Sequence, residues 1–117
     1  MTRLNQEEIK LMADYLCMSV DEATEVAEIF ADIREIEQGN LPGWKIHTPL
    51  DNVDDYIREW EDHWHREDNW TEFCDYEMDN CIEAYPDVFD SIDHFKDYVT
   101  GMGIAYELSN GLIIVVC

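Results

Sequence analysis

Acidic side chains recur at steps of three and four residues along two stretches of this sequence. The first set is Glu25, Glu28, Asp32 and Glu35, and the second is Asp51, Asp55, Glu59 and Asp62. On a helix such steps place side chains on one face, with a rise of about 6 Å for each step of four. Phosphates along one DNA strand also lie several ångströms apart, so a row of carboxylates at this spacing can imitate them.

An ordinary solvated helix face is the simpler interpretation of such a row. Ordinary faces, however, mix Glu with Lys at i,i+4, which is mildly stabilising, and these faces are nearly all acidic. A strongly basic target, such as the DNA groove of an enzyme, would explain that bias. The further candidate contact residues are Asp54, Asp75, Glu77, Asp79, Glu83 and Asp87.

The whole chain is acidic, with 28 Asp and Glu against 7 Lys and Arg in 117 residues and a formal charge of −21. Direct binding of nucleic acid or of an anionic membrane surface is excluded, because both need clusters of Lys and Arg. Disorder is common in such acidic chains. Here 46% of the residues are hydrophobic and four are Trp, which predicts a folded protein with a real core.

The residue types that usually carry catalysis or bind metals are not arranged for either role. His63 and His65 would point to different sides of a helix, and Cys74 and Cys81 lack the close pairing of zinc ligands. No glycine-rich phosphate loop and no Cys/His or Ser/His signature is present. We therefore predict no enzyme activity, no catalytic residue, no metal and no cofactor.

The location of the protein is indicated by what its sequence lacks. No apolar run approaches the ~20 residues of a membrane span, and the N-terminal segment lacks the apolar stretch of a signal peptide. Without a signal peptide, the four cysteines are interpreted as reduced thiols. These features predict a cytoplasmic protein without a membrane partner.

Capping pairs predict two helices at the start of the chain, Asn5 with Glu8 and Ser19 with Glu22. The short link between them predicts an antiparallel hairpin that ends at Gly39 and Asn40. The predicted inner residues are Ile9, Met12, Ala13 and Leu16, then Val26, Ile29 or Phe30, Ile33 and Ile36.

Asp51 is predicted to cap a third helix, whose outer face would hold Asp54, Asp55, Glu59 and Asp62. The apolar stripe of this helix would be Val53, Tyr56, Ile57, Trp60 and Trp64. Residues 70–85 fit either a helix or a strand, although their periodicity favours a helix. A further helix capped by Asp90 or Ser91 would bury Ile92, Phe95 and Val99, and end at Gly101 or Gly103.

The sequence closes on a predicted β-hairpin with its turn at Asn110 and Gly111. The run from Leu112 to Val116 is apolar on both faces, so this last strand should be covered. A hairpin alone is marginally stable, and residues 44–48 or 71–77 are the candidates for a third strand. The fold class predicted is α+β, a single domain over 1–117. A helical hairpin at 1–38 precedes an acidic α+β region at 39–117, in which helices pack on a small antiparallel sheet.

Two short motifs resemble those of ArdA-type antirestriction proteins. Residues 36–57 are similar to that family's opening, an acid-x-Gly-x-Leu-x-Gly turn and a Trp-bearing strand ending near Pro, followed by an acidic helix. The matching positions are Glu37, Gly39, Leu41, Gly43, Trp44, Pro49 and Asp51. Residues 73–77, Phe-Cys-Asp-Tyr-Glu, resemble a strand of the family that ends in Asp-Tyr-Glu, and the closing hairpin resembles the family's end.

The resemblance implies a non-enzymatic DNA mimic from a phage or mobile element that blocks a host defence nuclease of the restriction or CRISPR type. Its partner would be a basic nucleic-acid-binding protein or complex of the host, in the host bacterial cytoplasm. The resemblance also favours a strand at 72–77. The alternative is an acidic adaptor or regulator that binds a basic partner without DNA mimicry. The neutral last strand could also pair with a copy of itself, as edge strands do, which would give a homodimer.

Overall fold

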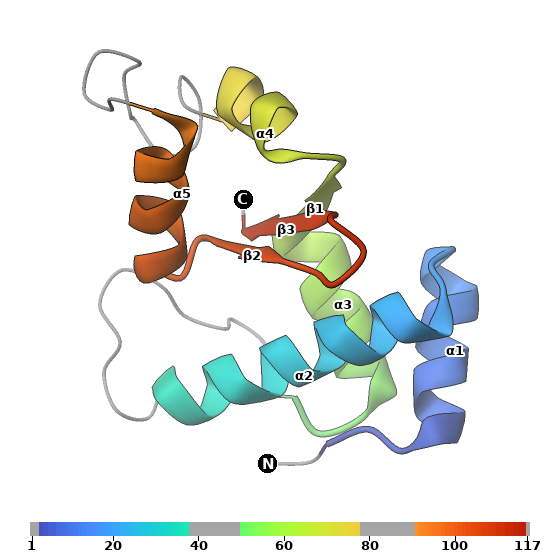
Figure 1. Ribbon diagram of the computed structural model, residues 1–117. Helices are drawn as coiled ribbons and strands as arrows, with labels where there is room; N and C mark the ends of the chain where they lie inside the picture. Colours follow the sequence, from blue (N-terminus) through green and yellow to red (C-terminus); the bar gives the residue numbers. More distant parts are fainter. Residues whose placement is uncertain (1–2, 38–49, 78–90, 117) are drawn as a thin grey trace. The chain divides into compact units, whose positions relative to one another are not determined.

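The computed structural model describes residues 3–37, 50–77 and 91–116, and their side chains at 3–33, 50–74 and 91–116 (Figure 1). These residues form helices and a small antiparallel sheet, which confirms the predicted α+β class. The chain divides into two compact units, Met1–His63 and Trp64–Cys117. The division between the units falls directly after the third helix.

Unit 1 begins with α1 (Gln6–Leu16), which packs against both α2 (Val20–Glu37) and α3 (Val53–His63) (Figure 1). The predicted capping box is present: Glu8 N donates to Asn5 Oδ1 at 2.9 Å, and Asn5 N donates to Glu8 Oε1 at 3.1 Å. One face of α1 is buried through Ile9, Met12 and Ala13. The α1–α2 pairing expected of a helical hairpin is therefore formed within a three-helix unit.

The second helix also starts at its predicted cap, because Glu22 N donates to Ser19 Oγ at 3.0 Å. Of the two alternatives for its inner face, Phe30 is fully buried and Ile29 is half-buried. The other buried residues of this helix are Glu22, Ala23, Val26, Ala27, Ala31 and Ile33. This continuous buried face fixes which side chains of α2 point outward.

Two predictions for α3 are wrong at its ends. Its capping side chain is Asn52, whose Oδ1 accepts from Asp55 N at 3.1 Å, rather than Asp51. Trp64 does not continue the helical stripe, because α3 ends at His63 and Trp64 begins strand β1 (Trp64–Glu67). The helix thus passes directly into a strand with no turn residue between them.

Unit 2 contains a three-stranded antiparallel sheet in the order β1-β3-β2, with β2 at Ala105–Glu107 and β3 at Ile113–Val116. The third strand is therefore β1, and neither of the predicted candidates is confirmed. Residues 71–77 are helical, and 44–48 lie outside the described residues. In the register, Trp64 faces Val116 across one edge of β3, and Ala105 faces Val115 across the other.

The predicted hairpin joins β2 and β3 through Ser109, Asn110 and Gly111. Gly111 N donates to Leu108 O at 3.0 Å, and Gly111 has a φ of 88° that favours glycine. Asn110 does not share this positive φ, so the loop has the three-residue form rather than the two-residue type I′ turn. As predicted, β3 is covered, with Ile113, Ile114 and Val115 fully buried.

Strand β3 is the central strand, paired on both sides. The interpretation of the last strand as a free edge is therefore wrong, because its backbone groups already bond to β1 and β2. A homodimer formed by pairing two copies of β3 is excluded by this arrangement.

Helix α4 (Trp70–Glu77) resolves the ambiguity at the start of 70–85 in favour of the helical periodicity. The strand that the ArdA resemblance favours at 72–77 is wrong, and residues 78–90 lie outside the described part. Asn69 caps α4 by accepting from Glu72 N at 2.9 Å. Helix α5 (Ile92–Gly101) is capped by Ser91, the second of the two predicted caps.

The core of unit 2 lies between these two helices and one face of the sheet. Phe73 and Phe95 meet with their ring centroids 5.5 Å apart, and both are buried with Val99, Ala105, Ile113 and Val115. The exception to the prediction is Ile92, which is 44% exposed rather than inside. It is the first residue of α5, one turn before Phe95, and it shares the face of Phe95 and Val99 without sharing their burial.

Candidate acidic interaction surface

The outward side of α2 carries a row of carboxylates that we call the α2 acidic row: Asp21, Glu25, Glu28 and Asp32. Asp21, Glu28 and Asp32 are exposed and Glu25 is half-buried. Glu35 continues the spacing in the same helix, although its side chain is outside the described set. Three of the four predicted acids of this helix are therefore placed at or near the surface, and Asp21 adds a member that the sequence pattern did not single out.

The charges of α2 are not balanced within the helix. From Val20 to Glu37 it has seven acids and one base, Arg34. Arg3, from the segment before α1, forms an ion pair with Asp32 at 2.8 Å, with the two side chains 49% and 60% exposed. Exposed pairs of this kind contribute about 0–1 kcal/mol, so Arg3 offsets only part of the repulsion.

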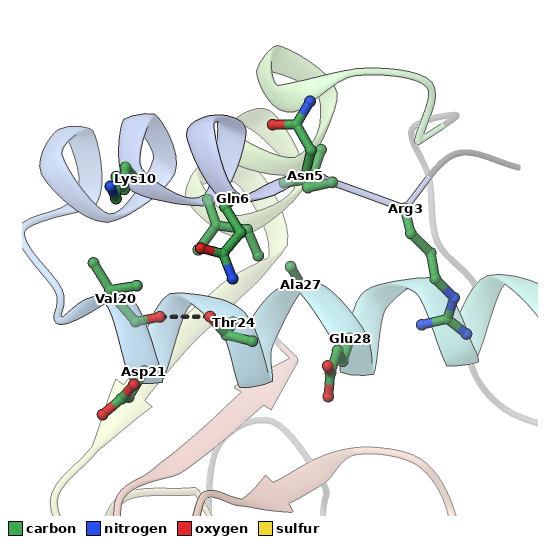
Figure 2. Close-up of a pocket in the computed structure, with 11 residues that line it drawn as sticks. Arg3, Asn5, Gln6, Lys10, Val20, Asp21, Thr24, Ala27 and Glu28 are labelled. Atoms are coloured by element: carbon green, nitrogen blue, oxygen red, sulfur yellow. Dashed lines mark hydrogen bonds between the residues drawn. The ribbon is translucent and has the colours of Figure 1, made fainter.

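A pocket of about 430 Å³ lies between α1 and α2 in unit 1 (Figure 2). Figure 2 shows Arg3 and Lys10 near opposite ends of it, with Asp21 and Glu28 projecting from α2. The side chain of Gln6 points from α1 toward α2, and Thr24 Oγ1 donates to Val20 O at 2.7 Å within α2. Charges of both signs therefore border the pocket, including two members of the α2 acidic row.

The second predicted row, on α3, is divided: Asp51 and Asp62 are exposed, whereas Asp55 and Glu59 are not. Glu59 is fully buried, and the side chain of Asp55 is only 16% exposed. Both carboxylate oxygens of Asp55 also have local partners. Its Oδ2 accepts from Asp51 N at 3.1 Å, and its Oδ1 lies 3.5 Å from Arg58 Nη1. The prediction that Asp55 and Glu59 face solvent is wrong, because this face turns inward with the buried Tyr56.

The exposed positions of α3 are Asp54, Arg58, Glu61 and Asp62, and Asp51 is exposed just before the helix. Glu61 is an exposed acid that the predicted row did not include. Its position at i+7 from Asp54 would have identified it once the inward face was known. Since Arg58 lies among these acids, the outside of α3 has mixed charge and imitates phosphates less well than α2 does.

The predicted acids of unit 2 are placed only in part. Asp75 and Glu77 belong to α4, with side chains outside the described set, and Asp79, Glu83 and Asp87 lie outside the described residues. Among the acids that the prediction did not include, Asp68, Glu72, Asp93 and Asp97 are exposed. Unit 2 therefore has its own acidic surface, on the segment before α4 and on α4 and α5.

One acid of unit 2 is held by specific contacts. Glu107 Oε2 on β2 lies 2.8 Å from Lys96 Nζ on α5 and accepts from Trp70 Nε1 on α4. Hydrogen bonds from Lys96 and then from Trp70 lower the pKa of Glu107, and the same bond raises the pKa of Lys96. Lys96 Nζ also lies 5.4 Å from the centre of the Trp70 ring. This cluster joins three elements of unit 2.

Metal centres and membrane spans are two further features that acidic or apolar residues can form. Among the described residues, no group of three or more His, Cys, Asp or Glu side chains is arranged to hold a metal ion. No helix in that part of the chain is both long and apolar enough to cross a membrane.

Comparison of the chain with known protein families, with curated proteins and with solved structures gave no match. The ArdA resemblance therefore stays a prediction carried by its short motifs.

Proposed function

We propose that this protein is a non-enzymatic inhibitor of a host nucleic-acid-binding defence enzyme, of the restriction or CRISPR type. It would act by presenting carboxylates at the positions where the enzyme binds the phosphates of a nucleic acid. The observation that carries this proposal is the α2 acidic row, whose members follow one another at three- and four-residue steps on the outside of a well-anchored helix.

The rigidity of α2 supports this role. The helix is fixed by its Ser19 cap and by a buried face that runs from Ala23 to Ile33. Carboxylates on such a helix keep a fixed spacing of about 6 Å for each step of four. A fixed row costs less entropy on binding than the same charges on an unstructured chain would.

Competition for the DNA site would follow from charge alone. An enzyme that binds DNA releases counterions from the phosphates, and its affinity falls steeply with salt. An acidic protein of net charge −21 would be attracted to the same basic groove over long range. Inhibition should therefore weaken as ionic strength rises.

The test is displacement of labelled DNA from a panel of purified restriction endonucleases and CRISPR effector complexes. We expect the wild-type protein to displace DNA from at least one of them. The triple variant E25Q/E28Q/D32N should need about tenfold more protein, if each lost charge contributes roughly 0.5 kcal/mol.

A matched control keeps the same loss of charge but removes it from unit 2. The variant E72Q/D93N/D97N changes three exposed acids and should inhibit nearly as well as the wild type. Equal loss in the two variants would mean that net charge acts rather than the α2 acidic row. Retention of DNA by every enzyme of the panel would refute the mimic.

An acidic adaptor that binds a basic partner without imitating DNA is the second candidate. The exposed side chains of Leu11 and Tyr15 favour it, because binding energy in specific interfaces is concentrated in a few apolar and aromatic residues. A mimic should lose function gradually as acids are neutralised one by one. An adaptor should lose most of its function on a single substitution.

A further inference from the structure

Helix α1 has an outward face that is not wholly polar. Leu11 and Tyr15 are 58% and 64% exposed, the two largest exposures among the large hydrophobic residues of the described chain. They are four residues apart, so they lie one above the other as a single ridge. The opposite face of the same helix is the buried one, with Ile9, Met12 and Ala13.

This ridge differs from the scattered apolar residues that any protein surface carries. The other exposed pair on one described helix, Ile92 and Tyr98 on α5, is six residues apart and does not share a face. Leu11 and Tyr15, four residues apart, together offer one apolar contact on the outward face of α1. Since α1 already packs on α2 and α3 through its buried face, the ridge serves neither contact.

The charges around the ridge indicate what it would bind. Glu7 lies one turn before Leu11 and Asp14 about one turn after it, both along one side of the ridge, and both acids are exposed. Lys10 is the one base of α1 itself. An apolar ridge with acids along one side is complementary to an amphipathic helix that carries Lys or Arg along one side of its apolar stripe.

We propose that the outward face of α1 docks a basic amphipathic helix of the partner, with Leu11 and Tyr15 as anchors and Glu7 and Asp14 at the rim. This rests on the proposed function only in taking the partner to be basic. It adds the place where the partner is anchored and held. A second copy of this chain is a poor occupant, because it would bring the same acids and a further −21 of charge to the interface.

The experiment uses two synthetic helical peptides of equal length and equal Lys content as probes. One has a leucine stripe, and in the other every leucine is replaced by serine. Titrated into the full-length protein, the leucine peptide should bind about tenfold more tightly than the serine peptide, as expected for one good apolar anchor. The double variant L11S/Y15S should reduce this preference to about twofold or less.

The matched control is I92S/Y98S, which removes the same kinds of side chain from α5 at positions that do not form a ridge. It should keep the tenfold preference, and circular dichroism should show that both variants are folded. The inference is wrong if L11S/Y15S keeps the preference, if both variants lose it equally, or if the wild type binds the two peptides alike. It is also wrong if sedimentation shows that wild type self-associates and L11S/Y15S does not.

These results separate the inference from the proposed function. If the DNA-displacement panel fails but the peptide preference depends on Leu11 and Tyr15, the docking face stands without the DNA mimic. If displacement succeeds and L11S/Y15S changes neither assay, the mimic stands and the docking face does not exist.

Discussion

The carboxylate of Glu107 shows how a chain with seven Lys and Arg uses one of them. Lys96 is placed over Trp70, and both donate to the same oxygen of Glu107. Because the deprotonated carboxylate receives both bonds, its pKa lies below the ordinary value of 4.5. The contribution of the cluster to folding is therefore present above the ordinary pKa and is lost as the pH falls through the lowered value.

The indole N–H of Trp70 should report this titration. We expect its NMR resonance to shift with a midpoint below pH 4.5. The variant K96M should move that midpoint to higher pH, because it removes the hydrogen bond from Lys96, the largest cause of the lowered pKa of Glu107. The measurement needs dilute protein, since the chain has little net charge near its isoelectric point of 4.1. A midpoint that K96M leaves unchanged would show that Lys96 does not control Glu107.

Residue patterns failed where the surroundings decide which face turns inward. On α3 the apolar stripe around Trp60 is strong, yet Trp60 is half-buried while Glu59 is fully buried. Sequence periodicity locates a helix, but it does not tell which face of α3 is buried, because packing on α1 determines that. The charge of a carboxylate was therefore a poor guide to its exposure here.

At the level of elements, local signals predicted the helices well. The caps at Asn5, Ser19 and Ser91 and the turn at Gly111 all act through groups a few residues apart, and all are confirmed. Strand β1 was missed because its sequence, Trp-His-Arg-Glu, follows α3 without a turn signal. It is a strand because β3, distant in sequence, supplies its hydrogen-bonding partners, and no local pattern contains that information.

The cap of α3 gives a test of one corrected element. Replacing Asn52 by alanine removes the acceptor for Asp55 N and should lower the free energy of unfolding by about 1 kcal/mol. Replacing the predicted cap, Asp51, should change it by less than about 0.5 kcal/mol, because that side chain is exposed. Urea unfolding of both variants measures the difference, and the reverse order would restore Asp51 as the cap.

At the scale of the whole molecule, repulsion among the acidic side chains works against the stability that the two cores provide. Basic residues offset some of it in the described pairs, such as Arg3 with Asp32 and Lys96 with Glu107. Solvent and counterions also relieve part of it. Such a surface lowers the stability of the free protein. Binding to a basic partner would relieve this repulsion.

Added salt should therefore stabilise the protein. Between about 0.01 M and 0.5 M sodium chloride the Debye length shortens severalfold, and a gain of about 1 kcal/mol would raise the melting temperature by about 4–8 °C. The variant E25Q/E28Q/D32N should melt higher than the wild type at low salt and respond less to added salt. A melting temperature that falls with salt would show that attractive pairs outweigh the repulsion.

The central place of β3 has a consequence for how the chain acquires its structure. Unit 1 pairs α1 with α2 across a short link, whereas the sheet of unit 2 needs β3 to enter between a distant β1 and an adjacent β2. Contacts between distant residues form more slowly than local ones. During synthesis of the chain, the backbone groups of β1 would stay without their strand partner until β3 is synthesised. Pulsed hydrogen exchange during refolding should thus protect amides of α1 and α2 before those of Trp64–Glu67.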